Sequence, residues 1–117
     1  MAKKILIVED DIGSADILEE IARNKGYDAS ALVTIPDNAG SELEKELENG
    51  NPDIIICDGL VGKYVDVFNI AKEKNIPFVL YTGDYYRTEE ERKNGNAAFK
   101  KPLENNELFK YLKEQLS

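Results

Sequence analysis

Residues 5–11 read Ile-Leu-Ile-Val-Glu-Asp-Asp, an apolar run that ends in three acidic side chains. Uninterrupted apolar runs of this kind are typical of strands that are buried on both faces, as in a parallel sheet. Three later apolar runs also end at polar residues, namely 54–57 at Asp58, 78–81 at Thr82, and 97–99 at Lys100-Lys101-Pro102. If all four runs are parallel strands, their carboxyl ends bring an acidic cluster, a lone carboxylate, a hydroxyl and an ammonium to one edge of a sheet.

The segments between these runs have the spacing of amphipathic helices. In residues 12–25, Ala15, Leu18 and Ala22 fall on one face, and Gly26 ends the segment. Strands are expected at 4–9, 27–33, 53–58, 77–82 and 97–100, and further helices over 37–49, around Val67, Phe68 and Ala71, and over 104–116. With one more helix before the last strand, five strands alternate with five helices. This order predicts an α/β fold, a doubly wound five-stranded parallel sheet in a three-layer sandwich.

The helix before the last strand differs from the others. Thr88-Glu89-Glu90-Glu91 has the pattern of a capping box, in which Thr88 and Glu91 satisfy each other's free backbone donors, and Gly95 closes the segment. The residues in between form no apolar face. We therefore expect a short helix that begins near Thr88, packs weakly and is mobile.

Composition restricts the class of protein. The 117 residues, of which 42% are hydrophobic, suit one domain over residues 1–117 and leave no room for a second. No apolar stretch approaches the roughly 18 residues of a membrane span. Met1-Ala2-Lys3-Lys4 is followed by too few apolar residues for a secretion signal, so we expect a cytoplasmic protein. The net charge of −8 argues against nucleic acid as the main ligand.

The chain contains no histidine and a single cysteine, Cys57. It therefore cannot hold a Ser-His pair, a histidine metal ligand or a phosphohistidine of its own. One cysteine excludes an internal disulfide and a cysteine-built zinc site. Any chemistry must come from carboxylates, hydroxyls and lysine.

The expected crowding of carboxylates predicts a divalent cation. Glu9, Asp10 and Asp58 would repel one another if bare, whereas Mg²⁺ prefers oxygen ligands and keeps positions open for phosphate oxygens. With the metal bound, Asp58 is expected to attack phosphorus and form an aspartyl phosphate. Thr82 and Lys101 are then expected to donate to the phosphoryl oxygens. Taken alone, the acidic stretch has a second interpretation, a solvated turn in which Asp11 caps the first helix.

Four motifs, KKILIVEDD, PDIIICD, IPFVLYTGD and FKKPL, together resemble response regulator receiver domains of two-component signalling. The resemblance covers essentially the whole chain and implies a flavodoxin-like fold. It assigns the acidic pair to Glu9 and Asp10, the phosphoacceptor to Asp58, the switch hydroxyl to Thr82 and the lysine before proline to Lys101.

The resemblance implies two further features. The backbone carbonyl of Leu60 would complete the metal site. The bond between Lys101 and Pro102 would be cis, which is a conformation that only bonds before proline adopt at appreciable frequency.

Two regions depart from the family pattern. Where the family has a Met-Pro and a later Gly after the phosphoacceptor, this chain reads Gly-Leu-Val-Gly-Lys over 59–63. The family's switch aromatic, three positions before the lysine, is replaced by Ala98, and the adjacent Phe99 faces the opposite way in a strand. Candidates for a substitute aromatic are Tyr81, Tyr85 and Tyr86.

The resemblance implies a stand-alone response regulator with Mg²⁺ as cofactor. It would accept a phosphoryl group from the phosphohistidine of a sensor histidine kinase or a histidine phosphotransfer protein. Phosphorylation would reshape the loops around 59–63 and 83–96, and residues 84–117 would form the surface for a downstream protein target. Its catalysis would be limited to its own phosphorylation and dephosphorylation, with Leu60 and Asp84 tuning the rate of phosphoryl loss.

Two other functions stay open at this point. The altered loop and Ala98 are compatible with a receiver-like interaction module that is never phosphorylated. A small phosphatase with Asp58 as nucleophile is a third possibility, but it would need a carboxylic acid at the position of Leu60.

Overall fold

The strands carry apolar side chains on both sides, and the sheet that they form is covered on both faces. The computed structural model describes residues 2–117. Its strands all pair in parallel, in the order β2-β1-β3-β4-β5. Their bounds are β1 Lys4–Glu9, β2 Asp28–Val33, β3 Ile54–Cys57, β4 Phe78–Thr82 and β5 Ala98–Lys100. This is the predicted doubly wound fold, in which the strand order reverses between β1 and β3.

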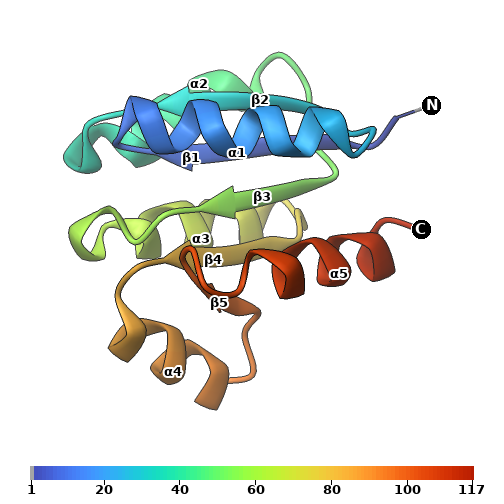
Figure 1. The fold of residues 1–117 in the computed structure, drawn as a ribbon. Helices are drawn as coiled ribbons and strands as arrows, with labels where there is room; N and C mark the ends of the chain where they lie inside the picture. Colours follow the sequence, from blue (N-terminus) through green and yellow to red (C-terminus); the bar gives the residue numbers. More distant parts are fainter. Residues whose placement is uncertain (1) are drawn as a thin grey trace.

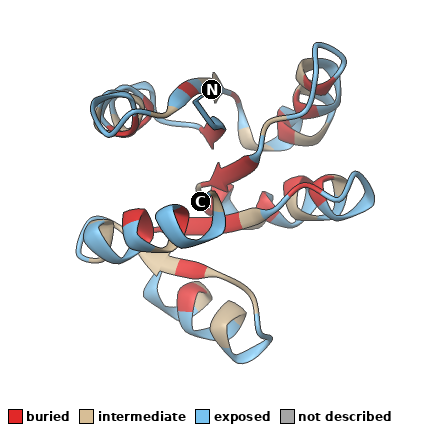
Figure 2. Ribbon diagram, turned by 90° about the vertical axis from the view of Figure 1, so that its right-hand side faces the viewer, coloured by how far each residue is buried: buried red, intermediate tan, exposed pale blue. Residues whose placement is uncertain are grey.

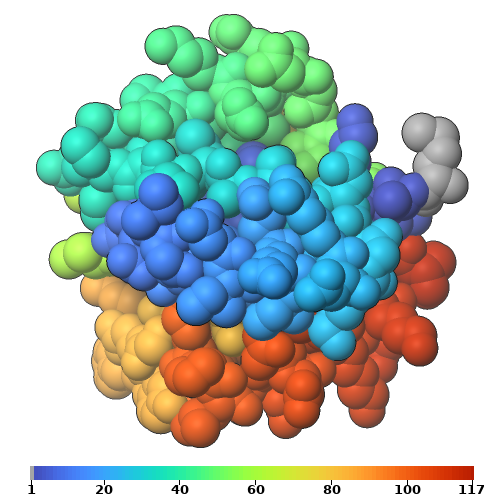
Figure 3. Space-filling view, turned by 45° about the horizontal axis from the view of Figure 1, so that its top comes forward, coloured from blue at the N-terminus to red at the C-terminus, as the bar shows by residue number. Residues whose placement is uncertain are grey.

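Helices lie on both faces of this sheet (Figure 1). They are α1 Ile12–Asn24, α2 Ala39–Leu47, α3 Tyr64–Glu73, α4 Tyr85–Lys93 and α5 Asn105–Gln115, with short 3₁₀ turns η1 Pro36–Asn38 and η2 Leu60–Gly62. Helices α1 and α5 pack side by side over one face (Figure 3), and α2 and α3 cover the other. Over residues 2–117, none of these helices has both the length and the apolar content that a membrane crossing needs.

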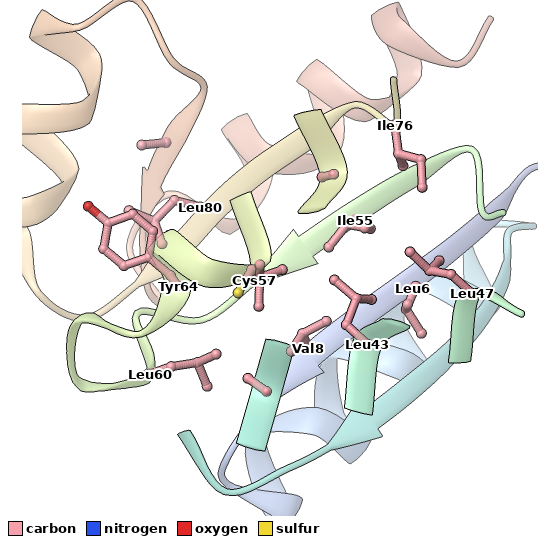
Figure 4. Close-up of a cluster of buried hydrophobic side chains, with 14 residues drawn as sticks. Leu6, Val8, Leu43, Leu47, Ile55, Cys57, Leu60, Tyr64, Ile76 and Leu80 are labelled. Carbon is pink, nitrogen blue, oxygen red and sulfur yellow. The ribbon is translucent and has the colours of Figure 1, made fainter. Parts of the chain in front are cut away.

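Alternate residues of each strand enter two different cores. In β1, Ile5 and Ile7 pack beneath α1 and α5, whereas Leu6 and Val8 pack beneath α2 and α3 (Figure 4). Burial is concentrated in the strands and on the inner sides of the helices (Figure 2). The uninterrupted apolar runs of the sequence are explained by this arrangement, because each side of a central strand faces a layer of helices.

The pairing register aligns the ends of the strands. Asp58, which follows β3, donates its backbone N–H to the carbonyl of Val8 at 2.9 Å, and Lys101, which follows β5, donates to the carbonyl of Thr82 at 2.8 Å. These bonds continue the β1–β3 and β4–β5 ladders by one residue. Glu9, the last residue of β1, therefore ends beside Asp58.

Helix α4 begins earlier than the sequence pattern predicted. Its N-cap is Asp84, whose carboxylate accepts a hydrogen bond from the backbone N–H of Arg87 at 3.1 Å. Thr88 lies one turn inside the helix, fully buried, and its hydroxyl donates to the carbonyl of Asp84 at 3.1 Å. The prediction of a capping box between Thr88 and Glu91 is therefore wrong. Asp84 is as good a cap as threonine and stands one turn earlier, so the helix begins there.

Weak apolar packing of α4 is confirmed. The helix lies against the edge strand β5 rather than over the centre of the sheet (Figure 1), and the buried residue that it contributes is Thr88. The mobility expected of this helix stays a prediction. The predicted helix over 37–49 also differs from the structure, which divides it into the turn η1 and the shorter helix α2, because Pro36 opens a 3₁₀ turn.

Candidate functional site

Three carboxylates meet at the carboxyl edge of the sheet. Glu9 ends β1, Asp10 is the next residue, and Asp58 follows the neighbouring strand β3. One carboxylate oxygen from each lies within 4.8 Å of the others. Glu9 is buried, Asp58 is half-buried and Asp10 is exposed, so the cluster has one open side toward solvent. The residues that the sequence predicted as metal ligands are thus brought together with oxygen atoms alone, which is the donor set that Mg²⁺ prefers.

The ammonium of Lys101 lies between two of these carboxylates. Its Nζ donates to Glu9 Oε2 at 2.7 Å and to Asp58 Oδ1 at 3.2 Å. Burial by itself lowers the pKa of Lys101, but the hydrogen bond with Glu9 and the charge of Asp58 outweigh it, so the pKa of the lysine is raised. Burial raises the pKa of Glu9, and the hydrogen bond from Lys101 offsets only part of that rise. The ammonium therefore keeps its proton and neutralises part of the local negative charge.

The hydroxyl of Thr82 faces the residue that follows Asp58. Thr82 is buried, and its Oγ1 accepts a hydrogen bond from the backbone N–H of Asp84 at 3.2 Å, which leaves its own hydrogen for another acceptor. A Cβ atom at Gly59 would lie only 2.9 Å from this oxygen. Gly59 has an ordinary helical φ of −63°, so the glycine is required here for space and not for backbone conformation.

The aromatic ring of Tyr81 lies beside the Lys101 ammonium, a contact that the sequence did not predict. The lysine Nζ lies 5.7 Å from the centre of the Tyr81 ring. The ring hydroxyl in turn accepts a hydrogen bond from Asn105 Nδ2 at 3.1 Å. Tyr81 is thus a positioning residue for the ammonium, and it lies on the α1 and α5 side of the sheet. The sequence signal that could have identified Tyr81 is its position directly before Thr82 in a strand. Side chains of consecutive strand residues point to opposite faces, so Tyr81 lies at the same end of the sheet as Thr82 but on the other face.

The loop after Asp58 has an unusual backbone. Leu60 and Val61 adopt φ values of +50° and +51°, a left-handed conformation that costs on the order of 1–3 kcal/mol at each non-glycine residue. The backbone N–H of Leu60 donates to Asp58 Oδ2 at 3.1 Å, while its side chain is fully buried in the core. Val61 is 88% exposed. This loop therefore closes back on the Asp58 carboxylate.

The carbonyl of Leu60 as a metal ligand stays a prediction. In the structure this oxygen accepts a hydrogen bond from the backbone N–H of Lys63 at 2.9 Å. A carbonyl oxygen has a second lone pair for a further partner. The Leu60 side chain, a hydrocarbon without hydrogen-bonding groups, is buried in the core. The peptide bond between Lys101 and Pro102 is cis, as the resemblance implied.

The remaining polar candidates have structural roles. Asp11 caps α1, because its carboxylate accepts a hydrogen bond from the backbone N–H of Ser14 at 2.8 Å. Hydrogen bonds from Ser14 lower the pKa of Asp11. The capping interpretation is thus correct for Asp11, while Glu9 and Asp10 belong to the carboxylate cluster. Burial raises the pKa of the Cys57 thiol well above its usual value, so this cysteine is a neutral core residue.

An aromatic residue that the sequence did not single out shares the core cluster of Ala98. Ala98 is buried in the core cluster that also contains Tyr64, the first residue of α3. Phe99 faces the other side of the strand and packs against Tyr111, with ring centres 5.6 Å apart. Tyr81 lies under Lys101, and Tyr86 is 77% exposed. Sequence reasoning missed Tyr64 because no local pattern connects residue 64 with residue 98.

Comparison of sequences and comparison of folds give different results. No protein-family model and no curated protein matched the chain. Solved structures, in contrast, match it over nearly its whole length. A response regulator from Chloroflexus aurantiacus, described as putative, is 26% identical, with a TM-score of 0.78 and coverage of 99% of this chain and 98% of that one.

Two further matches are structures of the response regulator TrrA from Thermotoga maritima. One is TrrA in complex with the histidine kinase ThkA, which is 26% identical, has a TM-score of 0.76 and covers 98% of this chain and 99% of that one. The other is TrrA with Mg²⁺ and BeF, at 24% identity and a TM-score of 0.74, covering 97% and 98%. The similarity extends over nearly all of both chains, so the whole fold is shared.

Proposed function

We propose that this chain, a response regulator receiver domain by its fold, accepts a phosphoryl group on Asp58 from the phosphohistidine of a partner protein. The observation that carries the proposal is that an oxygen of Asp58 lies within 4.8 Å of oxygens of Glu9 and Asp10, and that the Asp58 carboxylate accepts a hydrogen bond from the Lys101 ammonium at 3.2 Å. A half-buried carboxylate that contacts a cation and lies close to two further acidic groups suits a phosphoacceptor.

Each residue of the site has its own role in the proposed reaction. A carboxylate oxygen of Asp58 attacks phosphorus, the P–N bond breaks, and its electron pair leaves with the imidazole nitrogen of the donor histidine. The product is an aspartyl phosphate. Lys101 and Thr82 donate to the phosphoryl oxygens, and Tyr81 keeps the Lys101 ammonium in place.

The residues present fit a magnesium ion. Glu9, Asp10 and Asp58 would hold it through carboxylate oxygens, and the exposed side at Asp10 leaves room for water or phosphate oxygens. When bound, Mg²⁺ offsets the repulsion between the three carboxylates and the incoming phosphoryl group. The solved relative that contains Mg²⁺ and BeF supports this assignment.

The proposed donor is a sensor histidine kinase or a histidine phosphotransfer protein. The supporting observation is that a structural relative has been solved in complex with a histidine kinase. This chain contains no histidine, so the phosphohistidine must belong to the partner. The proposed output is the binding of a downstream protein target by the surface formed from residues 84–117.

The test is phosphorylation by a small donor. We expect the chain, incubated with Mg²⁺ and acetyl phosphate, to gain the mass of one phosphoryl group in a linkage that base hydrolyses and acid does not. The Asp58→Asn variant is the control, because an amide keeps the shape of the side chain and removes the nucleophile. A wild-type chain that gains no mass, or an Asp58→Asn variant that gains as much, contradicts the proposal.

A second candidate function is a receiver-like interaction module that is never phosphorylated. The observations that favour it are the backbone of the loop at Leu60 and Val61 and the small residue at Ala98. The same experiment separates the two functions, since a module of this kind would stay unmodified under all conditions. A phosphatase is disfavoured, because the buried Leu60 side chain stands where the second acid would be needed.

A further inference from the structure

Tyr64 is the point at which the loop after Asp58 meets helix α4. Its ring is buried in the core beside Leu80 (Figure 4), and its hydroxyl donates to Glu91 Oε2 on α4 at 2.5 Å. The guanidinium of Arg87, also on α4, lies 5.7 Å from the centre of the same ring. One side chain from the start of α3 therefore contacts α4 through both its hydroxyl and its ring.

The contact is maintained by the protonated hydroxyl. Burial raises the pKa of Tyr64 to about 12, and the hydrogen bond and charge of Glu91 add to the rise. The phenol therefore remains a donor at physiological pH. Glu91 also accepts a hydrogen bond from Asn96 Nδ2 at 2.8 Å, which orients its carboxylate.

The other polar contacts of α4 come from the segment that follows it in the sequence. Arg92 Nε donates to the carbonyl of Ala98 at 2.9 Å and pairs with Glu104, and Lys100 pairs with Glu89 at 2.7 Å. Together with Asn96, all of these partners lie between residues 96 and 104. Because α4 buries so little apolar surface, its position depends on such polar contacts. Tyr64 differs from these partners because it follows the loop after Asp58 in the sequence.

Hydrogen bonds connect the residues of the loop between Asp58 and Tyr64 to one another. The backbone N–H groups of Gly62 and Tyr64 donate to the carbonyl of Gly59 at 2.9 and 3.4 Å, and Leu60 N–H donates to the Asp58 carboxylate at 3.1 Å. These bonds connect the Asp58 carboxylate to the start of α3, so they form a continuous path from Asp58 to Tyr64. Gly62 also adjoins Arg87 of α4, since a Cβ atom there would lie 3.1 Å from the guanidinium.

From these contacts we infer that Tyr64 couples the state of Asp58 to helix α4, through its hydrogen bond to Glu91. The inference rests on the proposed phosphorylation of Asp58. The residue that transmits the change is thus an aromatic residue of α3, in the core cluster to which β5 contributes Ala98. Tyr64 acts as a positioning residue for α4 and takes no part in phosphoryl transfer.

The experiment compares amide hydrogen exchange of residues 84–96 before and after phosphorylation with Mg²⁺ and acetyl phosphate. We expect exchange in this segment to change in the wild-type chain. In Tyr64→Phe, which keeps the ring, we expect the same phosphoryl uptake but a change in exchange smaller by about fivefold, the equilibrium shift expected from one hydrogen bond. Amide hydrogen exchange of residues 59–63 should change on phosphorylation in both the wild-type chain and Tyr64→Phe.

Matched variants separate coupling from general loosening. Tyr111→Phe removes a hydroxyl from α5 and should keep the full response. Glu91→Ala removes the acceptor of both Tyr64 and Asn96. Adding Tyr64→Phe to Glu91→Ala should cause no further loss, because the bond that Tyr64→Phe breaks is already absent. A Tyr64→Phe variant that is phosphorylated and shows the full change in 84–96 overturns the inference alone, as does a phosphorylated wild-type chain without any change there. A wild-type chain that gains no phosphoryl mass overturns the proposed function and this inference together.

Discussion

Lys101 is the residue on which the electrostatics of the site depend. Its ammonium is the cation that contacts both Glu9 and Asp58, at 2.7 and 3.2 Å. Without it a buried carboxylate would lie beside a second one with no compensating charge, which is strongly unfavourable. Tyr81 beneath the ammonium limits where the flexible lysine side chain can lie.

Replacing Lys101 tests this role. We expect Lys101→Ala to slow phosphoryl uptake from acetyl phosphate by about a hundredfold, because one preorganised charged donor to the phosphoryl oxygens is lost. The measurement is the rate of mass increase. Lys100→Ala is the matched control, since Lys100 pairs with Glu89 on α4 and should leave the rate unchanged. Equal rates in the two variants would show that Lys101 is not part of the reacting site.

Helix α4 is the element whose stability comes mainly from polar groups. The other helices bury leucine or alanine side chains against the sheet, whereas α4 buries Thr88 and is otherwise bound by ion pairs and hydrogen bonds. Such a helix opens more easily than its neighbours, because little apolar surface is exposed when it does. Its N-cap should therefore contribute a large share of its stability.

Replacing Asp84 tests how much the N-cap contributes to the stability of α4. We expect Asp84→Ala to lower the free energy of opening of α4 by about 1 kcal/mol, because a backbone N–H of the first turn loses its acceptor. Amide exchange over residues 85–93 should then be faster by about fivefold. Asp84→Asn keeps a capping side chain and should stay near the wild-type rate. Unchanged exchange in Asp84→Ala would mean that the helix is capped at another residue.

At the scale of the whole molecule, the acidic cluster is an unfavourable feature that a cation would relieve. The chain carries a net charge of −8, and Glu9, Asp10 and Asp58 are gathered at one edge of the sheet. Like charges at this separation oppose folding. A ligand that binds only the folded chain shifts the folding equilibrium by mass action.

Magnesium should therefore stabilise the fold. At about one hundred times its dissociation constant we expect Mg²⁺ to raise the free energy of unfolding by about 2.7 kcal/mol. Thermal or urea unfolding with and without Mg²⁺ measures the difference. Asp10→Asn, at an exposed residue of the proposed metal site, should lose most of the effect, whereas Glu114→Gln on the exposed end of α5 should keep it. Equal stabilisation of the two variants would indicate general charge screening and not a site.

The part of the candidate site that could be predicted is the set of residues at the ends of the strands. Asp58 and Thr82 could be assigned because each ends an uninterrupted apolar run, and parallel strands end at one edge. The start of α4 could not be assigned in the same way. Asp84 and Thr88 are both good caps, and the local sequence does not say which one is buried. Only the packing of Thr88 against the rest of the molecule decides between them.

Hydrophobic periodicity is a local property of the chain, so the amino-acid sequence predicts the alternation of strands and helices and the edge at which the polar residues gather. Three features became evident from the folded chain alone: the Leu60 side chain is buried, the Lys101 ammonium contacts both Glu9 and Asp58, and Tyr64 binds Glu91. Each of these depends on the space around the residue and, for the two contacts, on partners far away in the sequence. Periodicity carries no information about such partners, which are selected by the way the layers pack.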